Sequence, residues 1–418
     1  MEYTFNFKRP SNGDTVSYQA SDTLDESVPA YMAFDCGNDL IDKFKAYYEP
    51  NYKKEIPRPH LFLINSSAVN AFAVHEKTLG EYCIGINYGA FQRIKEKAEE
   101  IVDMVIGKSA KVPKDDQLIP AQDRDKWVDF VYINAMRFFV AHEYAHILKG
   151  HIDTDGEGYF EFADETLSQK ENLFQQMKEF DADETAMNIL CYMNRSNFES
   201  LYHRQNDIIN QNLQDSNQKL KQAGIPEVLI NIQAQRYVDG IRRAHDEKIE
   251  NIRRHFKYLM LGVNVVFLVL DERRAKNLNR IADKLGIPQE NRTKFYFISG
   301  LQLIRNTDHP IPPLRLEAVI RIIDEYIESI EGTKNAEEIC KEVAGYVWEV
   351  EYLRCNFDVS KLYIHIAHTP TAQDFIREIE ALWQSEKSKF KPFMIQLERL
   401  FYENRIVDMS DDGILISS

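Results

Sequence analysis

The feature that most constrains this chain is the segment His142–His146, which reads HEYAH and fits the pattern HExxH. It lies within an apolar helical pattern that predicts one long helix from Lys126 to Lys149, stopped by Gly150. A spacing of four residues places both histidines on one face of that helix, close enough to bind a single metal ion. A fold that uses this motif must bring a further ligand to that face.

Glu143, directly after the first histidine, is the candidate catalytic base. A bound zinc ion lowers the pKa of its water to about 7, so a neighbouring carboxylate can take the water's proton near neutral pH. The alternative is a chance match, because five-residue HExxH patterns also occur by accident. The apolar helical context favours the metal site.

A second helix is predicted from Ser168, which begins a capping box, to about Met193. It carries the acidic run Glu179–Asp183. Catalytic zinc commonly has three protein ligands, and two histidines with one glutamate form such a set, so Glu179 is the predicted third ligand. Asp183, four residues on and on the same face, is predicted to accept a hydrogen bond from a ligand imidazole. A solvated acidic helix face is the alternative.

His151 is the competing candidate for third ligand. The metzincin pattern places a glycine three residues and a histidine six residues after the second histidine. Here Gly150 and His151 follow His146 at four and five residues. The spacing therefore predicts that His151 is a neighbouring surface residue, or one that supports a ligand without binding the metal.

Composition narrows the class of protein. The net charge of −15 argues against nucleic-acid binding, because phosphate attracts basic surfaces. The five cysteines include no CxxC pair, and no secretory signal is visible, so a cytoplasmic location is expected. The longest uncharged apolar run, Tyr258–Leu270, has thirteen residues, whereas a membrane span needs about 20. It predicts a buried helix, and no integral membrane segment is expected.

The fold class expected is α+β: a mostly helical, zincin-like domain with a small sheet, a helical insert and a helical tail. Strands are predicted at Leu61–Ile64, Val69–Val74 and Tyr82–Asn87, and helices at Phe91–Ile106 and, as a short amphipathic stretch, at Asp39–Tyr47. The expected organisation is an N-terminal segment over residues 1–56, a peptidase domain over 57–330 with an insert at 200–255, and a C-terminal helical region over 331–418.

Three separated motifs resemble one group of enzymes. The HExxH segment with Glu179–Asp183 is similar to the HExxH and ExxxD pair of gluzincin peptidases. His309 and Pro310 followed by Arg315 resemble the HPxxxxR element of the HtpX and CAAX-protease group. Asn70–Ala73 resembles the NAF strand beside the cleft of those enzymes. The nearest soluble resemblance is to Lit-type phage-exclusion peptidases.

This resemblance, over about residues 60–325, implies further site residues. Asn70, Ala71 and Phe72 would lie on an edge strand that pairs with extended substrate. His309 would stabilise the oxyanion, and Arg315 would anchor the acidic residues of the site. The transmembrane helices of HtpX and the CAAX proteases have no counterpart here, so the resemblance does not carry over their membrane substrates.

The expected function is zinc-dependent hydrolysis of peptide bonds in a peptide or protein substrate. One alternative is a Lit-like defence or toxin peptidase that cleaves one host protein. The other is a metal-binding interaction protein whose peptidase site is vestigial. The sequence leaves the oligomeric state open.

Overall fold

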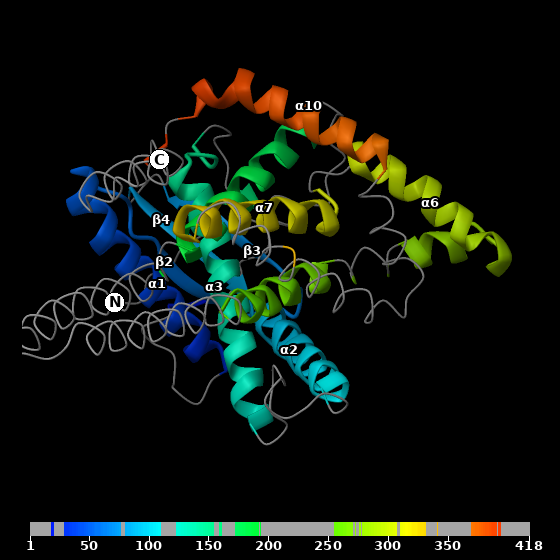
Figure 1. Ribbon diagram of the computed structural model, residues 1–418, viewed down its shortest axis with the longest axis horizontal. Coiled ribbons are helices and arrows are strands. Elements are labelled where there is room, and N and C mark those ends of the chain that lie inside the picture. The colour runs from blue at the N-terminus through cyan, green and yellow to red at the C-terminus, as the bar shows by residue number, and fades with distance from the viewer. Residues whose placement is uncertain are drawn as a thin grey trace, which may run out of the picture.

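The computed structural model describes residues 18–20, 29–76, 80–109, 123–153, 159–160, 172–191, 255–270, 278–306, 310–331 and 369–390, with a few positions beside these ranges (Figure 1). The predicted capping box at Ser168, residues 200–254 of the insert and much of the C-terminal region lie outside the described residues, as does His309.

A five-stranded mixed sheet forms one side of the molecule, in the order β1-β2-β4-β3-β5. The parallel pair is β2 with β4, and the other neighbours are antiparallel. The strands are β1 (Tyr18–Ala20), β2 (His60–Ile64), β3 (Ala71–Glu76), β4 (Glu81–Asn87) and β5 (Tyr159–Phe160). The three predicted strands are present within two residues of their predicted bounds.

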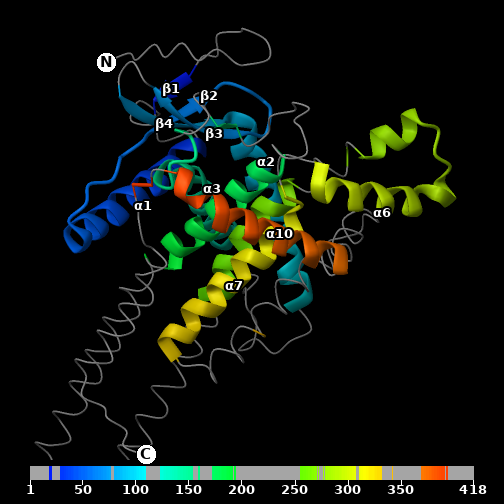
Figure 2. The same cartoon turned by 90° about the horizontal axis from the view of Figure 1, so that it is seen from above.

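Three helices pack against this sheet, α1 (Pro29–Tyr52), α2 (Tyr88–Ser109) and α3 (Arg124–Leu148). Figure 2 shows them beside the strands, and α3 contacts both α1 and α2 as well as β3 and β4. The helix predicted at Asp39–Tyr47 is longer than expected, because buried apolar side chains recur at helical spacing along α1 from Ala30 to Tyr48 and join the core.

Residues 255–270 form the predicted buried helix, and its apolar side chains join the same core as α3. Further along the chain come α6 (Gln289–Asn306), α7 (Pro312–Glu331), α10 (Pro370–Glu386) and a short 3-10 turn, η4 (Lys387–Lys389). Proline suits the start of α7, because the first turn of a helix needs no N–H donor there. Arg315 consequently lies on the first turn of α7.

The architecture is α+β, mostly helical with one small sheet, as predicted. Among the described residues, no helix is both long enough and apolar enough to cross a membrane.

Candidate metal centre

The central helix α3 is buried on every side over its second half, since each residue from Phe138 to Leu148 is buried. Burial of a polar side chain is costly, so a helix in this position carries polar side chains only where they have hydrogen-bond or ionic partners. His142 and His146 are such side chains, 1% and 0% exposed.

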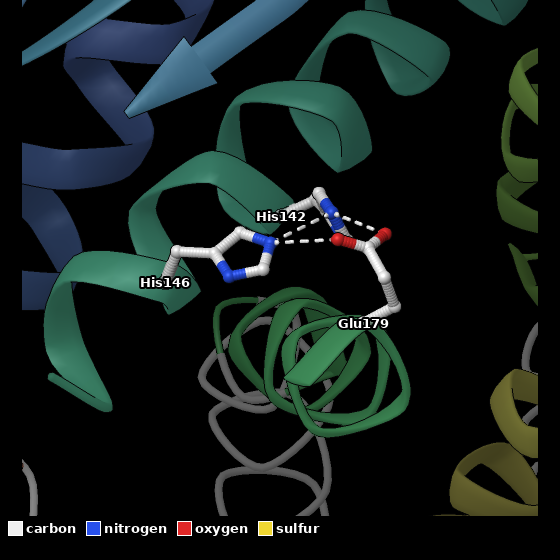
Figure 3. A group of neighbouring side chains, drawn as sticks. All are labelled: His142, His146 and Glu179. Atoms are coloured by element: carbon white, nitrogen blue, oxygen red, sulfur yellow. Dashed lines mark hydrogen bonds and ion pairs between the residues drawn. The ribbon is translucent and has the colours of Figure 1, made fainter. Parts of the chain in front are cut away.

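Glu179 completes a cluster with these two histidines (Figure 3). Residues 172–191 are helical, and Glu179 projects from that helix toward α3. Its carboxylate oxygens lie 3.4 Å from Nε2 of His142 and 3.4 Å from Nε2 of His146, and the two Nε2 atoms are 3.1 Å apart. One nitrogen or oxygen from each of the three residues lies within 4.8 Å of the others. The structure thus contains a buried His-His-Glu group that can hold a metal ion.

Asp183 and Arg315 lie behind this cluster. Nδ1 of His142 is 2.9 Å from Oδ1 of Asp183. Arg315 donates to both oxygens of Asp183, from Nε at 2.6 Å and Nη2 at 2.9 Å, and its Nη2 is 3.2 Å from Glu179. The fork-shaped pairing with Asp183 suits a guanidinium. The further contact of Nη2 joins Glu179 to the same cation.

The charges around the histidines favour a positive ion between them. Burial by itself lowers the pKa of the His142 imidazole, but the carboxylates of Glu179 and Asp183 outweigh it and hold that pKa well above its ordinary range. Burial, helped by the charge of His142, lowers the pKa of His146 well below its ordinary range. A divalent cation would satisfy the same carboxylates while leaving both rings neutral.

The end of α3 turns sharply at Gly150. This residue has φ 73°, the left-handed conformation that glycine adopts without strain. The N–H of Gly150 donates to the carbonyl of Ile147, and that of His151 donates to the carbonyl of His146, the two bonds of a Schellman motif. The turn folds His151 back toward the metal cluster.

His151 is completely buried, so the expectation of a surface residue is wrong, whereas the other expectation, of a residue that supports a ligand, agrees with its position. Its Nδ1 lies 3.0 Å from Nδ1 of His146, and its Nε2 lies 3.0 Å from Oδ2 of Asp181. Burial lowers the pKa of His151. Burial opposes ionisation of Asp181, but the neighbouring Lys149 and the bond from His151 lower the pKa of its carboxyl. The pair therefore consists of a neutral imidazole and a carboxylate.

Glu143 is also completely buried. It follows His142 on α3, the helix that supplies both histidines. A carboxylate in this position is sheltered from bulk water, as a base at a closed reaction site would be.

The predicted substrate-binding residues lie at the start of β3. Asn70 precedes the strand, and its carbonyl accepts the N–H of Asn87. The Oδ1 atom of Asn70 is buried and has no hydrogen-bond partner among the described residues. Ala71 and Phe72 are buried in β3. The predicted open edge is wrong for Phe72, because β5 pairs with Phe72 and Ala73 on the side of β3 away from β4. In the part of the chain that the structure describes, the pairing with β5 does not extend to Asn70 and Ala71.

The structure therefore brings together His142, His146, Glu179, Asp183 and Arg315, which the sequence places far apart. It does not describe His309, so the predicted oxyanion role of that residue lies outside the described part of the chain. Sequence reasoning missed the pairing of His151 with Asp181. The glycine at the end of the predicted helix was its one signal, because such a glycine reverses the chain toward the last helical turn.

Comparisons with protein-family models, with curated proteins and with solved structures found no match to this chain.

Proposed function

We propose that this chain is a zinc-dependent metallopeptidase of gluzincin type with a zincin-like fold. The observation that carries the proposal is the buried group of His142, His146 and Glu179, which come from two helices. Glu143, also buried, follows His142 on the helix that carries both histidines. Structural zinc sites usually have four protein ligands, whereas catalytic sites have three and leave one position for water or substrate. Three is the number found in the described part of the chain.

Both the ligand atoms of these residues and the side chains that hold the ligands suit a zinc ion. Imidazole nitrogen and carboxylate oxygen are zinc ligands, although other divalent ions accept the same donors. Asp183 holds the outer nitrogen of His142, and such a carboxylate sets the tautomer so that Nε2 presents its lone pair. When bound, zinc would polarise the scissile carbonyl and acidify the attacking water.

Glu143 supplies the proton transfers in this proposal. Its carboxylate would take a proton from the attacking water and later give it to the leaving amine. Arg315 would hold Glu179 and Asp183 in place throughout, since it binds both. A role for His309 as oxyanion donor and for Asn70 in substrate binding remains part of the proposal inferred from the family resemblance.

The first test is the metal content of the purified protein. Elemental analysis should find about one zinc per chain, because three ligands converge on one point. Glu179→Ala should lose the metal, whereas Asp183→Ala should keep much of it with lower affinity. Wild-type protein that neither contains zinc nor takes it up would contradict the metal site.

The second test separates chemistry from metal binding. Glu143→Gln should retain zinc and lose peptide hydrolysis, because the amide cannot accept the proton. Full activity in this variant would remove Glu143 as the base. A general substrate such as casein tests breadth: cleavage would count against a Lit-like enzyme specific for one host protein. Zinc binding with no hydrolysis of any substrate would favour the vestigial-site alternative.

A further inference from the structure

The two histidine ligands of the proposed zinc site differ in what supports their outer nitrogen. Nδ1 of His142 faces a carboxylate, Oδ1 of Asp183, at 2.9 Å. Nδ1 of His146 faces another imidazole, Nδ1 of His151, at 3.0 Å. Both rings of this second pair are 0% exposed, so bulk water does not reach either of them.

The contacts of His151 continue beyond His146. Nε2 of His151 lies 3.0 Å from Oδ2 of Asp181, and the other oxygen of Asp181 lies 3.0 Å from Nζ of Lys149. Asp181 is 8% exposed. The series therefore runs from His146 through His151 to a buried carboxylate that a lysine neutralises.

Only one placement of protons satisfies this series when His146 binds a metal. A neutral imidazole that offers its Nε2 lone pair to an ion carries its proton on Nδ1. That N–H needs an acceptor, so Nδ1 of His151 must bear a lone pair. The proton of His151 must then reside on Nε2, where it donates to Asp181. Asp181 thus determines the tautomer of His146 through an intervening ring.

We propose that His151, oriented by Asp181, is a positioning residue that sets the tautomer and ring orientation of His146 for metal binding. The inference rests on the proposed metal site, although it requires no catalytic activity. It assigns a role to the histidine that the spacing argument rejected as a ligand.

The surrounding structure holds His151 firmly in this orientation. The left-handed turn at Gly150 places the backbone of His151 at the end of α3. The buried Lys178 donates from Nζ to the carbonyl of His151 at 3.2 Å. The ring of Phe390 packs edge-on against the His151 ring, with centroids 5.2 Å apart. A residue held both at its backbone and at its ring can fix the orientation of a neighbouring imidazole, as the outer partners of metal-binding histidines do.

Removal of both ring nitrogens tests the proposal. His151→Phe keeps an aromatic ring against Phe390 but leaves Nδ1 of His146 without its acceptor. We expect the zinc dissociation constant, measured by competition with a chromophoric chelator, to rise about 10- to 100-fold. His151→Gln offers an amide acceptor and an amide donor, so it should recover part of that affinity. His75→Phe is the matched control: His75 pairs with Asp153 and should leave zinc affinity unchanged.

A spectroscopic measurement separates positioning from general stability. In zinc-loaded wild type, nitrogen-15 NMR should show protons on Nδ1 of both His142 and His146. In His151→Phe the His146 proton should exchange rapidly with water while the His142 proton persists. If His151→Phe does not fold, the same two measurements on His151→Gln decide the matter.

The outcomes distinguish this inference from the proposed function. Zinc affinity in the folded His151 variants within twofold of wild type, with the His146 proton still protected, would overturn the role of His151 alone. A wild-type protein that binds no zinc would overturn the metal site and this role together.

Discussion

Arg315 is a charged side chain that is only 2% exposed. Its two main partners, the carboxylates of Glu179 and Asp183, are buried as well. Arg315 and the two carboxylates together carry a net charge of −1. The carboxylates also hold the pKa of the neighbouring His142 imidazole well above its ordinary range, so a proton on that ring balances this charge before any metal binds. A buried ion pair of this kind contributes modestly as a whole, but the loss of one member leaves the others without compensation. The stability of the site without metal therefore depends on Arg315.

We predict that Arg315→Met lowers the free energy of unfolding of the metal-free protein by about 3–5 kcal/mol, because Asp183 and Glu179 lose their common cation. Zinc should restore part of that loss, since the ion neutralises Glu179. Denaturant unfolding with and without zinc measures both effects. The control is Arg377→Met on α10, where the pair with Asp374 is exposed and its loss should change stability by at most about 1 kcal/mol. Equal effects in the two variants would contradict the prediction.

At the scale of elements, the buried helix 255–270 approaches α3 unusually closely at Gly262. A Cβ atom there would lie 2.6 Å from Cβ of Asn134 and 2.7 Å from the backbone N of Ala135. Backbone atoms of a central helix do not move aside as a flexible side chain does. The distance between these two helices is therefore set by the absence of a side chain at one position.

We predict that Gly262→Ala destabilises the protein by about 1–3 kcal/mol, because the added methyl group pushes helix 255–270 away from α3, which carries His142 and His146. Zinc affinity should fall as well, since the helix carrying both histidines is displaced. Thermal unfolding and zinc titration test this. Gly107→Ala on α2 is the control, because a Cβ there has no neighbour within 4 Å and alanine favours helix. A stable Gly262→Ala variant would show that the two helices can separate without cost.

Local patterns explain why part of the site could be predicted. His142 and His146 lie on one helix, and Glu179 and Asp183 lie on another, each pair four residues apart. Helical geometry alone then decides which side chains share a face. That these two helices contact each other was predicted because catalytic zinc needs three protein ligands. No packing pattern in the sequence indicated the contact.

The remainder depends on backbone geometry that periodicity does not encode. The contact of His151 with His146 needs the left-handed turn at Gly150, and its contact with Asp181 needs the second helix at a particular height. The strands β1 and β5 have three and two residues, too few to show alternation. The close contact at Gly262 depends on the meeting of two helices more than 100 residues apart in sequence.

At the scale of the whole molecule, residues far apart in the chain close over the His151 side of the site. Phe390 stacks on Phe174 and on Trp383, and it makes an edge-to-face contact with the His151 ring. Three residues further on, the N–H of Phe393 donates to the carbonyl of Leu148 at the end of α3. The last described residues, which follow α10, are thus hydrogen-bonded to the end of the central helix α3.

We predict that Phe390→Ala destabilises the protein by about 3–5 kcal/mol, because a buried aromatic ring leaves a cavity. Backbone amides of residues 146–151 should exchange with solvent faster, since the ring covers their turn. Hydrogen-exchange mass spectrometry measures this locally. Phe130→Ala removes a ring that is 37% exposed and should have a smaller effect, with no change in exchange at that turn. Unaltered exchange in Phe390→Ala would show that the ring does not protect the turn.

Because β5 pairs with β3, a peptide that joins the sheet at Phe72 and Ala73 must first displace β5, and this sets a minimum affinity for such a peptide. Such a peptide competes with Tyr159 and Phe160 of the same chain, which are present at that edge by covalent connection. A tethered segment acts at an effective concentration in the millimolar range when its linker is short. A free peptide at micromolar concentration would have to bind about a thousandfold better than β5 to displace it, so the identity of residues 159–160 helps to determine which sequences can be bound there.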